Sequence, residues 1–255
     1  MRNFFILLVL AALSLPACGP KKDPAKPLVP PALNALTADE IASGWELLFN
    51  GYDLQGWKRY NADSIGPLWK VEDFSIVCDG RGLTEGTADI GGSLMTTREF
   101  GNFELSLEWK IGAGGNSGIL YHVVEAKKYK HDYETGPEYQ VMDDSGWEGE
   151  PLKEAQRAGS SYDMFPAPVT KKLMPAGEWN TAKVSYYNGH VEQWLNGEKV
   201  VSFDENSKEY DAQYEKSKWK GYPDWNKSKT GHITLQDHGA RVAYRNIRVR
   251  IPAVQ

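Results

Sequence analysis

Two segments with the pattern of β-strands carry polar side chains on one face. In the first, Glu138 and Gln140 are two residues apart, so their side chains share a face of an extended strand. In the second, Gln236 and His238 share a face in the same way. A carboxylate and an imidazole can transfer protons, and polar groups on a sheet face need water or a ligand to bond. We predict that both strands line one concave polar surface, with Glu138 as the first candidate for acid/base chemistry and His238 as the second.

Asp143 follows on the same strand but falls on the face opposite Glu138. A β-bulge after Gln140 would turn its carboxylate to the Glu138 side. The spacing Glu138-x-Gln140-x-x-Asp143 then resembles the acidic strand motif of retaining β-glucanases, with Gln140 in place of the central Asp. A conventional glycosidase with Glu138 and Asp143 as its carboxylate pair is therefore an alternative.

Short strands must position these groups, since helical patterns are scarce in the 255 residues. The segment 103–111 alternates apolar and polar residues as an antiparallel strand with one solvated face does. Asn-Gly pairs at 188–189 and 196–197 predict tight turns in a three-stranded meander. One capped helical turn is expected after Thr37, and a short helix within 207–218. The pattern predicts a single β-sandwich domain.

Two loops can complete the polar surface. The glycine-rich segment 112–118 lacks the Lys-Ser/Thr and the helix of a phosphate-binding loop, so a phosphate site is not expected. Its Asn116 can contact a ligand where glycines allow close approach, although a plain hairpin connection explains the segment equally well. The long polar segment 148–172 resembles a functional or mobile loop, and its Tyr162 is a candidate wall or lid residue.

The N-terminus has the features of an export signal. A short positive start precedes an apolar run over 4–15, and the following Leu-Pro-Ala-Cys resembles the lipobox of bacterial lipoproteins. We predict a signal peptide over 1–17, lipidation of Cys18 and a lipid anchor in the outer membrane, on its periplasmic or surface face. A plain secretory signal is the alternative. The proline-rich segment 18–43 is predicted to be a linker, which leaves 44–251 as the folded domain.

The charge and the cysteine content argue against nucleic-acid binding and against a disulfide. The net charge is −5 and no basic cluster is present, so nucleic acid is not an expected partner. Cys78 is the only cysteine besides Cys18, and we expect a buried apolar side chain rather than a disulfide or a nucleophile. No cofactor and no metal site is predicted. Calcium as a structural ion is compatible with Asp143 and Asp144 but no spacing matches a known site.

Six co-linear motifs resemble one family, the bacterial 3-keto-disaccharide hydrolase domain, which is often described as a secreted glycosyl hydrolase. They include GPEYQVMD at 136–143 and GHITLQDHG at 231–239, and the others lie at 48–57, 116–121, 177–180 and 244–247. The resemblance implies an all-β fold, a concanavalin A-like jelly roll of two curved antiparallel sheets with sugar bound on the concave side. It also implies a carbohydrate substrate already oxidised at C3, and therefore a partner oxidoreductase that forms the ketone.

A ketone at C3 acidifies the C2 proton, so a base, an acid for the leaving oxygen and donors for the enolate can cleave the glycoside by elimination and rehydration. The predicted substrate contacts are Asn116, Tyr121, His122, Gln140, Asp143, Tyr162, Gln236 and Arg245. Among them, Arg245 or His122 is expected to face negative charge. Besides the conventional glycosidase, a non-catalytic, lectin-like glycan-binding module is a further alternative, because a fold does not decide between them.

Overall fold

The structure is a computed structural model that describes residues 33–80 and 91–252. These residues belong to one compact unit, which runs from Pro31 to Gln255. The predicted signal peptide, Cys18 and most of the predicted linker lie outside the described residues. No helix in the described part of the chain is both long and apolar enough to span a membrane.

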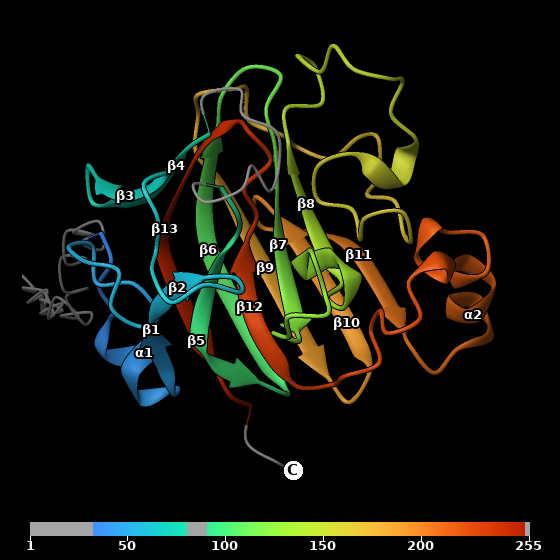
Figure 1. Ribbon diagram of the computed structural model, residues 1–255, viewed down its shortest axis with the longest axis horizontal. Helices are drawn as coiled ribbons and strands as arrows, with labels where there is room; N and C mark the ends of the chain where they lie inside the picture. Colours follow the sequence, from blue (N-terminus) through green and yellow to red (C-terminus); the bar gives the residue numbers. More distant parts are fainter. Residues whose placement is uncertain (1–32, 81–90, 253–255) are drawn as a thin grey trace, which may run out of the picture. The chain divides into compact units, whose positions relative to one another are not determined.

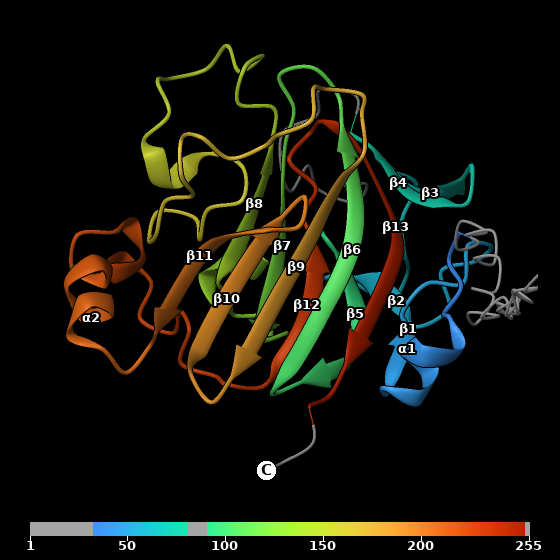
Figure 2. The ribbon, with the colours of Figure 1, turned by 180° about the vertical axis from the view of Figure 1, so that it is seen from behind.

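Two antiparallel sheets face each other and form a sandwich, as the front and back views show (Figures 1 and 2). The eight-stranded sheet has the order β11 (Glu198–Asp204), β10 (His190–Leu195), β9 (Asn180–Tyr187), β6 (Phe103–Ile111), β13 (Arg241–Arg250), β4 (Ser75–Asp79) and β3 (Trp69–Glu72), and β1 (Trp45–Leu47) also pairs with β13. The five-stranded sheet has the order β2 (Trp57–Arg59), β5 (Leu94–Phe100), β12 (Gly231–Leu235), β7 (Asn116–Val123) and β8 (Glu138–Met142). The predicted all-β jelly-roll sandwich is confirmed.

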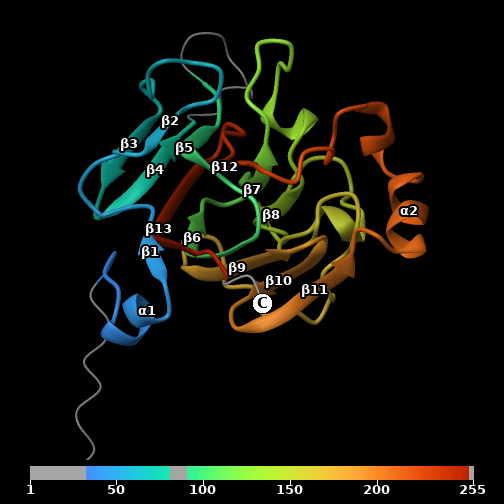
Figure 3. The ribbon, with the colours of Figure 1, turned by 90° about the horizontal axis from the view of Figure 1, so that it is seen from below.

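The core lies between the two sheets, which Figure 3 shows one above the other. In β6 every second side chain, from Phe103 to Ile111, is buried, while the polar residues between them are half-buried on the outer face. From the five-stranded sheet, Tyr139 enters the core and its hydroxyl donates to the Trp194 carbonyl at 3.1 Å. Cys78 is also buried between the sheets, as its sequence context predicted.

Local sequence signals explain the turns and helices. The Asn-Gly pairs close their hairpins with positive φ, at 49° and 90° for Asn188 and Gly189. Thr37 caps α1 (Ala38–Ala42) and forms the predicted capping box with Glu40. The predicted short helix is α2 (Lys208–Tyr214), followed by a 3₁₀ turn, η3 (Lys218–Gly221). Strands β2 and β5, which the sequence did not reveal, have no sustained alternation of buried and exposed residues.

Candidate functional site

The outer face of the five-stranded sheet carries the polar residues that the sequence placed together. Strand β8 pairs with β7 in regular register, with Gln140 opposite Gly118 and Glu138 opposite Leu120. On the other side of β7, the main-chain amide of Gln236 donates to the Gly118 carbonyl at 2.9 Å. Gln140, Gly118 and Gln236 therefore form one row across three strands. Because Tyr139 points into the core, its neighbours Glu138 and Gln140 face outward.

Gly118 provides the floor on which the Glu138 carboxylate lies. A Cβ atom at Gly118 would stand 2.2 Å from Glu138 Oε1, which no real side chain could do without displacement. The Glu138 side chain is nevertheless only 5% exposed, so protein surrounds it from above as well. The absence of a side chain at Gly118 thus places a buried carboxylate between the two glutamines.

Three amide oxygens on this face are buried without a hydrogen-bond partner: Asn116 Oδ1, Gln140 Oε1 and Gln236 Oε1. The Gln140 amide nitrogen donates to the Gln156 carbonyl at 3.0 Å, which fixes the orientation of that amide. A buried acceptor without a donor costs about 1–3 kcal/mol. Sugar hydroxyl groups are donors that would remove this cost, so the face is suited to a polyhydroxylated ligand.

His238 lies at the rim of the same face, beyond the end of β12. Its neighbour Asp237 turns inward and accepts hydrogen bonds from the Gly92 and Gly239 amides at 3.0 and 3.1 Å. His238 itself is exposed, yet the protein around the imidazole desolvates it and lowers its pKa below the ordinary value near 6.5. His238 is therefore mainly neutral at neutral pH and can accept a proton.

A lysine and several aromatic rings border the main chain of Glu138 on its other side, and of these the sequence indicated only Tyr162. The Tyr162 main-chain amide donates to the Glu138 main-chain carbonyl at 3.0 Å, so the loop 148–172 borders this strand. The Lys218 ammonium lies 4.4 Å from the Tyr162 ring centroid, 4.3 Å from that of Trp219 and 5.5 Å from that of Tyr133. Three segments distant in sequence thus meet beside the Glu138 end of β8.

Asp132 is a second carboxyl group that sequence reasoning missed. It begins the 3₁₀ turn η1 (Asp132–Glu134), is only 2% exposed, and accepts hydrogen bonds from Thr234 Oγ1 at 2.7 Å and the Tyr133 amide at 2.9 Å. Burial raises its pKa. Thr234 is opposite Leu120, which in turn is opposite Glu138, so Asp132 belongs to the same face and fixes η1 on it.

The structure does not bring Tyr121 and His122 to this face. Leu120 pairs with Thr234 and Val123 with His232, so two residues of β7 stand opposite one of β12 in a bulge, and His122 has a φ of 54°. Both side chains enter the core, where the two rings are 5.3 Å apart. Burial lowers the pKa of His122 to about 4. The expectation that they contact substrate is corrected accordingly.

Asp143 and Arg245 are also separated from Glu138. The β7–β8 pairing has no shift in register, so the bulge that would turn Asp143 beside Glu138 is absent. Asp143 instead accepts from the Gly114 amide at 2.9 Å; although burial opposes it, this bond and those from Ser145 lower its pKa. Arg245 lies on the eight-stranded sheet and pairs with Glu108 at 2.7 Å. Neither prediction of a substrate contact is supported.

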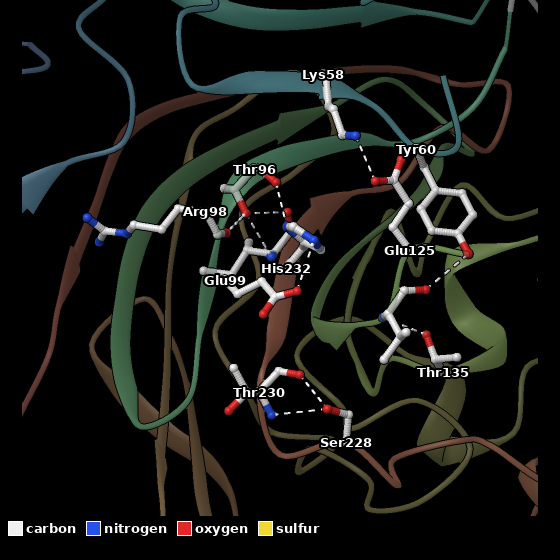
Figure 4. A network of polar contacts seen from close by, with 12 residues as sticks. Lys58, Tyr60, Thr96, Arg98, Glu99, Glu125, Thr135, Ser228, Thr230 and His232 are labelled. Atoms are coloured by element: carbon white, nitrogen blue, oxygen red, sulfur yellow. Dashed lines mark hydrogen bonds and ion pairs between the residues drawn. The ribbon is translucent and has the colours of Figure 1, made fainter. Parts of the chain in front are cut away.

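The opposite end of β12 is occupied by a structural network, shown in Figure 4. His232 donates from Nδ1 to the Thr96 carbonyl at 2.8 Å, and its Nε2 lies 3.5 Å from Glu99. Nearby, the Lys58 ammonium binds Glu125 at 2.7 Å. These partners satisfy His232, whereas the unpaired acceptors lie towards His238. Within residues 33–80 and 91–252, no group of three or more His, Cys, Asp or Glu side chains could hold a metal ion.

Comparison with known proteins provides clear relatives. Residues 44–250 match the family described as the 3-keto-α-glucoside-1,2-lyase-like domain. Over 248 residues the chain is 34% identical to a 3-keto-disaccharide hydrolase of Bacteroides thetaiotaomicron, covering 89% of this chain and 85% of the relative. Two crystal structures of candidate glycosyl hydrolases from Parabacteroides distasonis are similar. One has a TM-score of 0.79 at 40% identity over 87% of this chain and 100% of its own. The other has a TM-score of 0.62 at 25% identity over 82% and 99%.

Proposed function

Because the chain belongs to the 3-keto-α-glucoside-1,2-lyase-like family and is a glycosidase-like hydrolase, we propose that its substrates are glycosides already oxidised to a ketone at C3. The site is the outer face of the five-stranded sheet around Glu138 and Gly118. The family description, which refers to a lyase acting across C1 and C2, supports an elimination at those two carbons.

The reaction proceeds in two steps, an elimination followed by the addition of water. A base removes the proton from C2, and the electron pair moves into an enolate whose charge rests on the C3 oxygen. The enolate then expels the C1 substituent, whose oxygen takes the proton that the base has removed from C2, and a C1–C2 double bond conjugated with the ketone remains. Water adds at C1 and a proton returns to C2, so the sum is hydrolysis to a 3-keto sugar and a free alcohol.

Glu138 is assigned to the C2 proton, because its carboxylate lies on Gly118, in the row between Gln140 and Gln236. His238, neutral through its lowered pKa, accepts a proton from the water that adds at C1. The amide oxygens of Asn116, Gln140 and Gln236 accept hydrogen bonds from the sugar hydroxyls. The observation that carries this proposal is the group of three buried, unpaired acceptors around one buried carboxylate.

Substrate choice tests the proposal directly. Purified protein is given a 3-keto-glucoside, the parent glucoside and a plain β-glucan, and sugar release is measured. We expect release from the keto compound alone. Release from β-glucan would support a conventional glycosidase, although the separation of Asp143 from Glu138 disfavours that pair. Binding of all three without release would indicate a lectin-like module.

The N-terminal sequence leads to a proposal about location. Export with lipidation of Cys18 would anchor the enzyme in the outer membrane, close to an oxidoreductase that supplies the ketone. Metabolic labelling with a fatty acid in the native host tests this. The full chain is expected to incorporate the label and a Cys18→Ser variant is not. Equal labelling of both proteins, or labelling of neither, would contradict lipidation at Cys18.

A further inference from the structure

Lys218 is the cation that the fold brings to the Glu138 end of the site. It begins η3, and its ammonium lies over the rings of Tyr162 and Trp219 at 4.4 and 4.3 Å from their centroids. Aromatic faces attract a cation. Since the Tyr162 main-chain amide donates to the Glu138 main-chain carbonyl, the ring under the ammonium belongs to a residue that borders the Glu138 strand.

The backbone around Lys218 is firmly held. The Lys218 amide donates to Asp163 Oδ2 at 2.7 Å, and the Trp219 indole donates to the Tyr162 carbonyl at 2.8 Å. Trp219 is fully buried and stacks on Trp225 with ring centroids 5.0 Å apart. The loop 148–172 and η3 are thus joined by hydrogen bonds next to the ammonium. An exposed lysine on a flexible loop would have none of these restraints.

Lys218 also acts electrostatically on the far side of the site. After desolvation, which is the largest cause, the charge of Lys218 helps to lower the pKa of His238, while Asp237 acts in the opposite direction. The ammonium therefore acts on His238, and it lies over the ring of Tyr162, whose main chain is hydrogen-bonded to that of Glu138. A positive charge in this position would stabilise the negative charge of an enolate that forms between Glu138 and His238.

We propose that the Lys218 ammonium binds the C3 oxygen of the substrate and stabilises the enolate that forms when the C2 proton leaves. This role rests on the proposed function and adds a source of specificity. The C3 hydroxyl of the parent glucoside develops no charge, so Lys218 would lower the barrier only for the oxidised sugar. The neutral amides alone would distinguish the two sugars much less.

Proton exchange on a 3-keto sugar without a leaving group isolates the enolate step. The probe is 1,5-anhydro-3-keto-glucitol in deuterium oxide, and exchange at C2 is followed by NMR. Lys218→Met is expected to slow enzymatic exchange about a hundredfold, the usual effect of losing one oxyanion stabiliser. Lys218→Arg, which keeps the charge, should recover a substantial part. Lys220→Met is the matched control, since Lys220 lies on the same turn but pairs with Glu215 at 2.5 Å on the surface.

The outcomes separate this role from the function on which it depends. No exchange by the native protein would overturn the 3-keto function itself. Exchange by native protein and by Lys218→Met at equal rates would overturn only the role of Lys218. A titration of His238 by NMR adds a readout independent of turnover: its pKa should rise in Lys218→Met and stay in place in Lys218→Arg. An unchanged pKa in Lys218→Met would show that the ammonium is too far away.

Discussion

The two outer faces of the sandwich carry polar residues of different kinds. On the eight-stranded sheet a groove of about 260 Å³ is lined by Trp179, Lys110 and Arg245, among others. Its charges are largely paired: Arg245 binds Glu108 at 2.7 Å, and Arg241 binds Glu72. Arg245 and Lys110 also lie over the Trp179 ring. The outer face of the five-stranded sheet instead holds three buried amide oxygens without hydrogen-bond partners, beside the buried Glu138 carboxylate.

The presence of buried acceptors without hydrogen-bond partners identifies a functional face better than its polarity or the presence of a groove does. Partly exposed ion pairs such as Arg245–Glu108 add little stability and are satisfied without a ligand. Buried acceptors without donors lower the stability of the folded protein, and that cost is recovered only when a ligand supplies hydroxyl groups. The larger effects of mutation are therefore expected on the five-stranded sheet.

Replacing the carboxylate should have the largest effect. Glu138→Gln keeps the shape but cannot accept the C2 proton, so kcat on a 3-keto-glucoside is expected to fall at least a hundredfold. The matched control is Glu108→Gln on the eight-stranded sheet, where kcat should stay within about twofold because only a partly exposed pair with Arg245 is lost. Near-normal turnover of Glu138→Gln would remove it from the mechanism.

A methyl group in the floor should displace the same carboxylate without changing it. The Cβ atom of Gly118→Ala would stand 2.2 Å from Glu138 Oε1, and a misplacement of about 1 Å can cost a hundredfold in rate. We expect kcat to fall by tens of fold, and because a buried side chain must be displaced, the melting temperature should also fall. Gly112→Ala is the control, since its Cβ would meet only an ordinary contact at 3.6 Å. Equal rates for the two variants would place the reaction elsewhere.

Removing one acceptor should weaken binding more than catalysis. Gln236→Met keeps the length of the side chain but loses the oxygen that is buried and unpaired. Loss of one hydrogen bond to a sugar hydroxyl corresponds to about 1 kcal/mol, so KM should rise roughly fivefold with kcat nearly unchanged. Because the unpaired acceptor also disappears, the free protein should be as stable as the native one or more so. A fall in kcat with constant KM would assign Gln236 to the chemistry instead.

The pH dependence distinguishes the two proton-transfer groups. His238 must be neutral to accept a proton, and desolvation lowers its pKa below the ordinary value near 6.5. Activity should therefore persist as the pH falls to about 6.5, and it should decline only when the pH falls through the lower pKa of His238. The acid limb of kcat/KM, measured against pH, should shift or vanish in His238→Gln. An unchanged limb in that variant would assign the titration to another group.

The smallest effect is expected on the eight-stranded sheet. Trp179→Ala removes the aromatic ring from the groove, beneath Lys110 and Arg245. Since the groove lies on the other sheet from Glu138, kcat/KM on a soluble 3-keto-glucoside should stay within about twofold. A tenfold loss in a folded variant would show that the comparison between the two faces is wrong.

Local patterns predicted most of the fold and half of the site. The alternation over β6 and the Asn-Gly turns are properties of neighbouring residues, and their strands appear where the sequence placed them. The shared face of Glu138 and Gln140 follows from the same period of two. The bulge at Tyr121 and His122 does not, because it depends on register with β12, more than a hundred residues away. The sequence of β7 alone does not show that shift in register, and the shift places the side chains of Tyr121 and His122 in the core rather than on the outer face.

Lys218 and Asp132 escaped prediction for a related reason. Each lies in a short 3₁₀ turn with no periodic pattern, and each reaches the site only because distant segments pack together. A run of Lys-Trp-Lys-Gly-Tyr after a polar helix is compatible with many surface loops. Its meaning comes from the contacts of Trp219 with Tyr162 and Trp225, which no local rule supplies.

The fate of the C2 proton tests the central claim most directly. A 3-keto-glucoside is cleaved in deuterium oxide, the product is trapped by reduction at once, and deuterium at C2 is measured by mass spectrometry. Samples without enzyme and with Glu138→Gln correct for spontaneous exchange. Elimination on the outer face of the five-stranded sheet predicts one deuterium at C2 for each bond cleaved by the native enzyme. Cleavage with hydrogen retained at C2 would show direct hydrolysis and contradict the account.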